Sequence, residues 1–311
     1  MKVLLAGATG AIGTQLVPRL IAAGHEVTGT TTSESKRALL AEMGATPALM
    51  DLLDPEQVAT VVADAAPDAI VHEATALTGI NPRKMEQSFA VTNRLRTEGT
   101  DHLLSAGRAA GVKRFVAQSF AGWPFARVGG AIKTEEEPLD TDPPKQMRTI
   151  LEAIRYLERA VTDADWTEGV VLRYGGFYGP GTSLAPGGEQ LEPIRKRRFP
   201  IVGDGEGIWS LIHVADAADA TALALERGAP GIYHVVDDDP APVHEVLTVI
   251  SEDLGVGKPR RAPRWVGRLF GGEGAVVMMT EVRGASNEKT KRELGWRPKH
   301  PSWRGNLVTG R

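Results

Sequence analysis

Three glycines spaced three residues apart stand near the start of the chain, within Gly7-Ala8-Thr9-Gly10-Ala11-Ile12-Gly13. An apolar strand is expected over residues 2–6, and residues 15–21 have the apolar spacing of a helix. Glycines in such a turn let backbone N–H groups approach a pyrophosphate, and the positive end of the helix points at the same place. The spacing therefore predicts a dinucleotide-binding loop. Its expected contacts are Gly7, Thr9, Gly10, Ala11, Ile12 and Gly13.

The residues after the second expected strand bear on the choice between NAD and NADP. In dinucleotide-binding folds an acidic side chain about 20 residues past the glycines binds the ribose 2′-hydroxyl and selects NAD. Here Thr31 stands at that position, and it is followed by Thr32, Ser33 and the basic Arg37, which suit a 2′-phosphate. Glu34 argues locally against a phosphate. We expect NADP, with NAD as the alternative; a solvated helix start is the structural alternative for the same residues.

The elements that must position these residues alternate between strand and helix. Further strands are expected at 25–30, 46–50, 69–74, from about 114, and at 169–173, with helices at 35–43, 55–65, 86–110 and 148–163. This alternation predicts an α/β fold with a doubly wound parallel sheet of the Rossmann type. We expect the dinucleotide-binding domain over residues 1–175, with a returning segment near 208–236. Residues 176–311 are expected to form mainly a smaller, interleaved substrate-binding part.

Further patterns lie far apart along the chain. They are Arg173-Tyr174-Gly175-Gly176-Phe177-Tyr178-Gly179-Pro180, Leu211-Ile212-His213-Val214-Ala215-Asp216, and Leu294-Gly295-Trp296-Arg297-Pro298. Together with the glycine loop they resemble the short-chain dehydrogenase/reductase superfamily, in its extended, epimerase/dehydratase-like branch. The resemblance covers nearly the whole chain.

The resemblance implies further cofactor contacts beyond the glycine loop. It assigns Asp51 to the adenine, and it places the cofactor along the ends of the later strands. The contacts implied there are Leu52, Ala74, Thr75, Ala76, Asn93, Gln118, Gly175 and Phe177. Glu73 is a departure, because the family usually has an apolar residue at that position.

The proton-transfer pair of this superfamily is missing. Its members use a Tyr-x-x-x-Lys pair on one helix, where the lysine lowers the pKa of the tyrosine. Aligned on Glu158, the two positions are Ile150 and Ile154, and no Tyr-x-x-x-Lys occurs anywhere in the chain.

Only weaker candidates remain for a catalytic hydroxyl. The usual serine position aligns with Phe120, one residue after Ser119. We therefore expect Ser119 and Tyr174 as the candidate catalytic residues, in an atypical active site.

Two kinds of function fit these patterns. The first is an NAD(P)-dependent oxidoreductase or epimerase-like enzyme acting on a small carbonyl or hydroxyl compound. The alternative is a non-catalytic NADP(H)-binding sensor or scaffold. A nucleotide-sugar epimerase is a weaker third reading, because Trp209 stands where such members place an arginine on the diphosphate.

The amino-acid composition limits the classes of binding partner that we expect. The 36 basic and 39 acidic side chains give a formal net charge of −3, which gives no reason to expect nucleic acid or a membrane as partner. The chain has no cysteine, and its seven histidines show no ligand spacing, so no metal site is expected. We expect a cytoplasmic protein with a small-molecule substrate. The resemblance implies a possible homodimer through the helices at 86–110 and 148–163.

Overall fold

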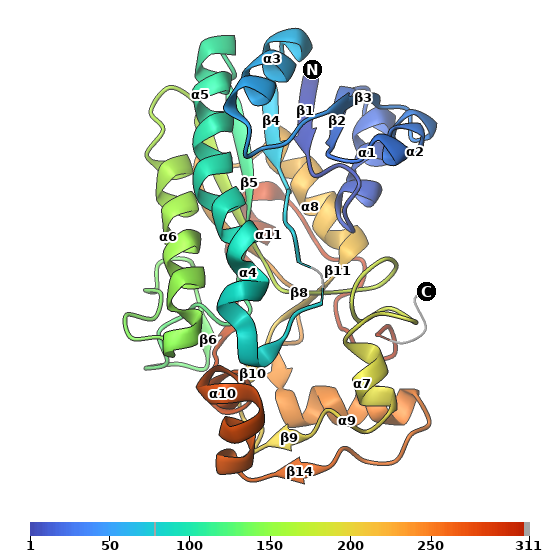
Figure 1. Cartoon of the computed structure of the whole chain (residues 1–311), viewed down its shortest axis with the longest axis vertical. Helices are drawn as coiled ribbons and strands as arrows, with labels where there is room; N and C mark the ends of the chain where they lie inside the picture. Colours follow the sequence, from blue (N-terminus) through green and yellow to red (C-terminus); the bar gives the residue numbers. More distant parts are fainter. Residues whose placement is uncertain (78, 308–311) are drawn as a thin grey trace.

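A seven-stranded sheet crosses the molecule in the order β12–β7–β5–β4–β1–β2–β3, and every neighbouring pair is parallel (Figure 1). The computed structural model describes residues 1–77 and 79–307. The strands are β1 (Lys2–Ala6), β2 (Glu26–Thr31), β3 (Thr46–Leu49), β4 (Ala69–His72), β5 (Arg114–Phe120), β7 (Glu168–Tyr174) and β12 (Gly231–Val235). The predicted doubly wound parallel sheet is therefore confirmed.

Helices cover both faces of this sheet (Figure 1). One face carries α1 (Gly13–Ala22), α8 (Val214–Glu226) and α11 (Glu288–Leu294), with α2 (Arg37–Glu42) at its edge. The other carries α3 (Pro55–Ala65), α5 (Thr100–Ala110) and α6 (Arg148–Thr162). Each face of the sheet has its own apolar core. Because side chains alternate along a strand, Val3 and Leu5 of β1 pack on the α1 face, and Leu4 packs on the α5 face.

The order of the sheet reverses at β1, which has β2 on one side and β4 on the other. Open α/β sheets bind ligands outside the carboxyl ends of their strands at such a reversal. The glycine loop follows β1 directly, so the predicted phosphate-binding turn lies at the reversal point.

The long helix expected over residues 86–110 is interrupted by a wider turn. It consists of α4 (Met85–Arg94), a π-helical segment over Leu95–Gly99 that we call the π turn, and α5. The helix ends at Gly111, whose φ of 72° is in the left-handed region. A π turn inserts one extra residue into a helix and is frequent at functional sites.

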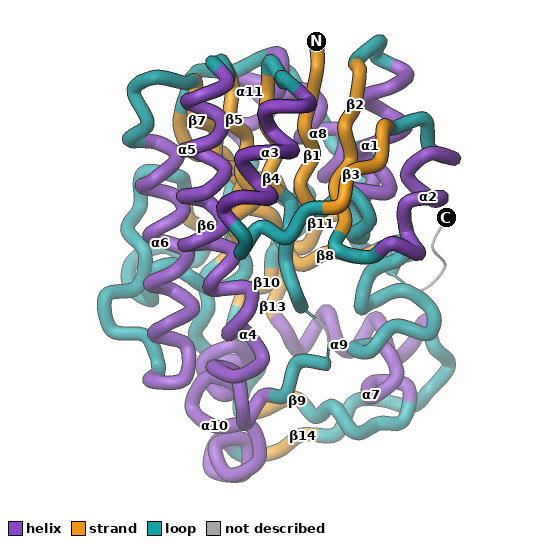
Figure 2. Tube along the Cα trace, turned by 45° about the horizontal axis from the view of Figure 1, so that its top comes forward, coloured by secondary structure: helices purple, strands orange, loops and turns teal. Residues whose placement is uncertain are grey.

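A second group of elements lies beyond the carboxyl ends of the sheet (Figures 1 and 2). Short strands pair two by two: β8 (Gly176–Tyr178) with β11 (Leu211–His213), β9 (Ile201–Val202) with β14 (Arg261–Ala262), β10 (Ile208–Trp209) with β13 (Ala241–Pro242), and β6 (Ile132–Lys133) with β15 (Gly284–Ala285). Three helices accompany them: α7 (Leu191–Arg195), α9 (Val243–Asp253) and α10 (Arg264–Thr280). The chain returns to the main sheet between these pieces, through α8 and β12.

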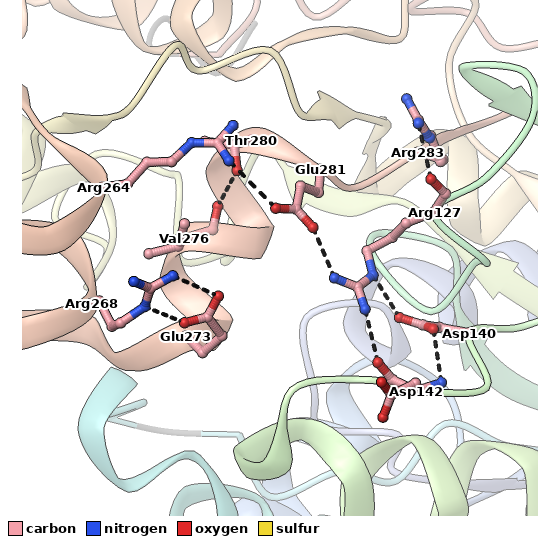
Figure 3. A network of polar contacts seen from close by, with 10 residues as sticks. All are labelled: Arg127, Asp140, Asp142, Arg264, Arg268, Glu273, Val276, Thr280, Glu281 and Arg283. Atoms are coloured by element: carbon pink, nitrogen blue, oxygen red, sulfur yellow. Dashed lines mark hydrogen bonds and ion pairs between the residues drawn. The ribbon is translucent and has the colours of Figure 1, made fainter.

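Helix α10 turns apolar side chains to solvent at its start. Trp265 is 66% exposed, and Leu269 and Phe270 are exposed to a similar degree. Arg268, between Trp265 and Leu269, pairs with the Glu273 carboxylate (Figure 3). Within the described chain, every helix is too short or too polar to span a lipid bilayer.

Candidate cofactor and active site

The glycine loop is packed so closely that two of its glycines have no room for a side chain. A Cβ on Gly7 would lie 2.7 Å from the Ala74 nitrogen, and Gly7 has a φ of 87°. A Cβ on Gly13 would lie 2.5 Å from the Gly7 carbonyl oxygen, where helix α1 begins. A Cβ on Gly10 would lie 3.3 Å from the Gly7 carbonyl oxygen, which is a tight contact but a less severe one than at the other two glycines. The loop therefore has the shape of a phosphate cradle.

The start of α1 is electrostatically suited to an anion. Its first turn contains no acidic residue, and no side chain caps it at Ile12. The N-terminal N–H groups and the helix dipole thus present positive charge where Thr9, Ala11 and Ile12 surround the turn.

The residues expected at the adenosine end lie together at the carboxyl ends of β2 and β3. Thr31 accepts a hydrogen bond from the Ser33 backbone N–H at 3.2 Å and lies 3.5 Å from the Thr9 hydroxyl. Thr32 is exposed. Arg37 is also exposed, and its guanidinium pairs with Glu34 at 3.1 Å.

Asp51 and Leu52 follow β3, near the expected adenine end. Asp51 is exposed, and its carboxylate accepts from the Leu53 N–H. Leu52 is buried, and its carbonyl oxygen lies 2.7 Å from the His102 ring. A Cβ on Gly99 would lie 3.3 Å from the Leu52 side chain, so the π turn that leads into α5 packs directly on this segment.

The expected contacts at the ends of β4, β5 and β7 leave polar atoms without partners. The side-chain oxygens of Asn93 and Gln118 are buried and accept no hydrogen bond from the described residues. Beside them the Ala76 N–H donates to the Thr92 hydroxyl at 3.0 Å, while Ala74 and Thr75 line the strand end.

Gly175 and Phe177 complete the edge on β7 and β8. A Cβ on Gly175 would lie 2.7 Å from the Ser210 carbonyl oxygen, and the Phe177 ring lies 5.3 Å from that of Tyr174. The glycine cradle, the uncapped start of α1 and the unpartnered amide oxygens of Asn93 and Gln118 together fit a nicotinamide dinucleotide. Such a coenzyme would supply or accept a hydride when bound.

Tyr174 belongs to a buried network on the α8 face of the sheet. Its hydroxyl donates to Glu73 at 2.8 Å and shares a hydrogen bond of 2.7 Å with the Thr221 hydroxyl. Burial raises the pKa of Glu73 to about 8, and burial beside Glu73 raises the pKa of Tyr174 well above its usual value. The second oxygen of Glu73 has no partner among the described residues. Its acidic type at the end of an apolar strand was the sequence signal for this network.

Ser119 belongs to a different buried network on the α6 face. Its hydroxyl donates to Glu158 at 2.7 Å, and Arg173 holds both oxygens of the same carboxylate, each at 2.7 Å. All three residues expose less than 5% of their surface. The structure thus separates the two candidate hydroxyls onto opposite faces of the sheet, and a catalytic role for either stays a prediction.

The positions of the missing pair are apolar in three dimensions as well. Ile150 and Ile154 are buried in a cluster with Phe89, Trp123 and Met147. All four tyrosines of the chain have a raised pKa: burial causes this for Tyr174, Tyr178 and Tyr233, and a hydrogen bond to Asp101 causes it for Tyr156. No tyrosine is therefore prepared for proton exchange near neutrality.

Trp209 adds to this apolar region. It is partly buried against the same cluster, and its indole N–H donates to the Met278 carbonyl oxygen at 3.0 Å. Its only side-chain donor is thus occupied within the protein.

One group of potential metal ligands comes together that spacing along the chain does not indicate. His213, Asp216 and His300 place ligand atoms within 4.8 Å of one another. Asp216 already accepts from the backbone N–H groups of Lys299 and His300, at 3.0 and 2.8 Å. These bonds fix the C-terminal segment on α8, and we assign no metal to the group.

Comparison with known proteins agrees with this geometry. Residues 3–235 match the model of the NAD dependent epimerase/dehydratase family. The chain is 41% identical to a 3-diazoavenalumate denitrifying reductase of Streptomyces sp over 308 residues, 99% of each chain. It is 30% identical to a 2-alkyl-3-oxoalkanoate reductase of Stenotrophomonas maltophilia, over 84% of this chain and 77% of the relative.

A solved structure shows the same fold. The UDP-glucose 4-epimerase of Thermus thermophilus, in complex with NAD, superposes with a TM-score of 0.75 at 26% identity and covers 100% of this chain and 98% of its own. The relatives are named as reductases and epimerases, which supports an enzyme and gives no support to the sensor alternative. The chain therefore belongs to the NAD-dependent epimerase/dehydratase family, within the extended short-chain dehydrogenase/reductases.

Proposed function

We propose that the protein is an NADPH-dependent reductase that delivers a hydride to a small aromatic diazo compound and releases dinitrogen. The reductase at 41% identity, which spans the whole chain, is named for a diazo substrate and for denitrification. The observation that carries the proposal is the lack of a protein proton donor at the expected place. Ile150 and Ile154 occupy it, and every tyrosine has a raised pKa.

Proton balance explains why such a site suits this reaction. Reduction of a carbonyl to an alcohol consumes a hydride and a proton, so the enzyme must present an acid. Replacement of a diazonium group by hydride forms one C–H bond, breaks the C–N bond and releases N₂ without consuming a proton. A site with isoleucines in place of the tyrosine–lysine pair is therefore adequate for the second reaction and lacks the usual acid for the first.

The surroundings favour an apolar aromatic substrate over a nucleotide sugar. Trp209 stands where a diphosphate-binding arginine is expected, and its N–H is already bonded to Met278. The cluster of Phe89, Trp123 and Ile154 supplies apolar surface nearby. Apolar and aromatic side chains bind uncharged rings, whereas diphosphates require cations.

For the coenzyme we propose NADPH. Thr31 offers a hydroxyl where a carboxylate would repel a 2′-phosphate, and Arg37 lies on the next turn of chain. The Arg37–Glu34 pair is exposed, so the guanidinium is free to exchange that partner for a phosphate at small cost.

The test mixes the purified chain with NADPH or NADH and an ortho-diazophenol carboxylic acid. We expect oxidation of NADPH matched one to one by release of N₂, measured with a ¹⁵N-labelled substrate by mass spectrometry. Because no proton moves in the reductive step, we expect a solvent deuterium isotope effect near unity on turnover. Oxidation of NADPH without N₂, or no oxidation at all, contradicts the proposal.

Reduction of a small ketone is the second candidate function. It is supported by the 30% identity to a 2-alkyl-3-oxoalkanoate reductase. The same assay with a panel of aldehydes and 3-oxoacids distinguishes the two, since ketone reduction requires proton delivery and predicts a clear solvent isotope effect.

A further inference from the structure

Arg96 differs from the other buried arginines. Three arginines are buried among the described residues. Arg173 is held by Glu158, and Arg114 by Glu168 and several carbonyl oxygens. Arg96 is only 6% exposed, yet its guanidinium makes no hydrogen bond or ion pair with any described residue, and its Nη1 is fully buried without a partner.

An unpaired buried cation opposes folding, because it loses its hydration without compensation. Burial lowers the pKa of Arg96 to about 10, so the guanidinium remains charged at neutral pH. The folded chain therefore carries a cation whose partner is absent from the described residues. A bound anion would supply that partner.

The charged groups around Arg96 do not neutralise it. Glu158 is the carboxylate close enough to affect its pKa, but both oxygens of Glu158 are already bonded to Arg173 and one also to Ser119. Burial lowers the pKa of His72 to about 4 and the charge of Arg96 contributes to this shift, so this imidazole is neutral. Glu158 is therefore the bonded counterion of Arg173 and leaves Arg96 without one.

Arg96 is placed by the π turn, next to residues expected to contact the coenzyme. The π turn packs on α6, and the Leu95 carbonyl oxygen lies 3.2 Å from the His72 ring at the end of β4. Asn93, with its unpartnered amide oxygen, is one helical turn earlier. The extra residue of a π turn changes which side chain faces inward, and such turns are frequent at functional sites.

We propose that Arg96 is an oxyanion-binding residue for a ligand bound at the carboxyl ends of β4 and β5. The oxyanion is a carboxylate of the substrate or a phosphate of the coenzyme. A guanidinium binds both of these through paired, charge-assisted hydrogen bonds. The inference rests on the proposed function only in its choice of an aromatic acid as the substrate. The anion site itself is tested by binding measurements that need no turnover.

The experiment compares Arg96→Met, Arg96→Lys and Arg94→Met. Arg94 lies on the same helix and forms an exposed pair with Glu98, so its loss is the matched control. Calorimetry measures the dissociation constants of NADP⁺, and of cinnamate and its uncharged amide on the NADP⁺-saturated protein. Thermal unfolding is measured without ligand.

We expect Arg96→Met to raise the melting temperature of the ligand-free protein and to weaken binding of one anion about 10- to 100-fold, the range of a charge-assisted hydrogen bond. Arg96→Lys should retain most of the affinity, and Arg94→Met all of it. Weaker cinnamate with unchanged cinnamamide identifies the substrate as the source of the oxyanion. Weaker NADP⁺ with unchanged cinnamate identifies the coenzyme.

Two results overturn the inference. Unchanged binding of both anions to Arg96→Met shows that the guanidinium binds neither. A lower melting temperature, or failure of Arg96→Met to fold, shows that Arg96 is a structural cation for Glu158. Neither result changes the outcome of the diazo assay, because that assay measures turnover by the unaltered protein. The two proposals can therefore fail independently.

Discussion

Two buried polar networks lie on opposite faces of the same sheet, and each contains one carboxyl group. On the α6 face, Glu158 is paired with a guanidinium and a hydroxyl. On the α8 face, Glu73 has hydroxyl neighbours only, and burial raises its pKa to about 8. The two carboxyl groups therefore differ in their partners: the first is paired with a cation, and burial without a neighbouring cation keeps the second protonated at neutrality.

The comparison also bears on catalysis, because each network contains one of the candidate hydroxyls. Ser119 donates to the carboxylate that Arg173 holds, and Tyr174 donates to a carboxyl group that is neutral near pH 7. Both hydroxyls are hydrogen-bonded within these networks. The predictions below separate a structural role from a catalytic one.

The largest effect is expected from Arg173→Met. It leaves Glu158 as a buried charge with one hydroxyl partner, which should lower the free energy of unfolding by about 3–5 kcal/mol. Urea unfolding measures this, and Arg94→Met, which breaks an exposed pair, should leave the free energy of unfolding nearly unchanged. A double variant, Arg173→Met with Glu158→Leu, should recover much of the loss. Equal costs for the single and double variants would refute the charge argument.

Tyr174→Phe should lower the free energy of unfolding by about 1–3 kcal/mol, because it removes the only hydrogen-bond partner of the buried Glu73 carboxyl among the described residues. Tyr156→Phe is the matched control, since that hydroxyl bonds to Asp101 at the surface. We expect turnover to survive in both variants. A loss of activity in Tyr174→Phe at unchanged NADPH affinity would instead place the phenol in the reaction.

Glu73→Gln should change how stability depends on pH. The folded pKa of about 8 lies above the ordinary 4.5, so the protonated form stabilises the fold fully below pH 4.5 and this contribution is lost as pH rises to about 8. The slope is at most about 1.4 kcal/mol per pH unit for one group. Urea unfolding across this range should show a shallower decline in Glu73→Gln.

Asp237 provides a comparison for that slope. Its pKa is also raised to about 8, mainly by burial, so Asp237→Asn should remove a second, separate part of the decline. The double variant should decline less steeply between pH 4.5 and pH 8 than either single variant. A decline as steep as in the unaltered protein would mean that neither carboxyl is protonated in the fold.

The smallest effect is expected from Ser119→Ala. Glu158 keeps both bonds to Arg173, so the free energy of unfolding should fall by only about 0.5–1.5 kcal/mol. Steady-state kinetics should show kcat within a few-fold of the unaltered chain. A drop of about 100-fold or more, the size of a general acid–base contribution, would restore Ser119 as a catalytic residue.

The sequence determined the fold and the close-packed glycine loop. Apolar strands, helical spacing and glycine turns are local properties, so the Rossmann sheet and the cradle around Gly7 and Gly13 are readable from residue order. The absence of a Tyr-x-x-x-Lys pair is likewise a fact of sequence.

The tertiary structure alone decided what the remaining polar residues do. Glu158 and Arg173, or Glu73 and Thr221, are separated along the chain, and their hydrogen bonds and pKa values depend on burial and on partners brought by packing. The lack of a partner for Arg96 could not be predicted from the sequence for the same reason. Residue type identifies a cation, but only the folded chain shows that no described group pairs with it.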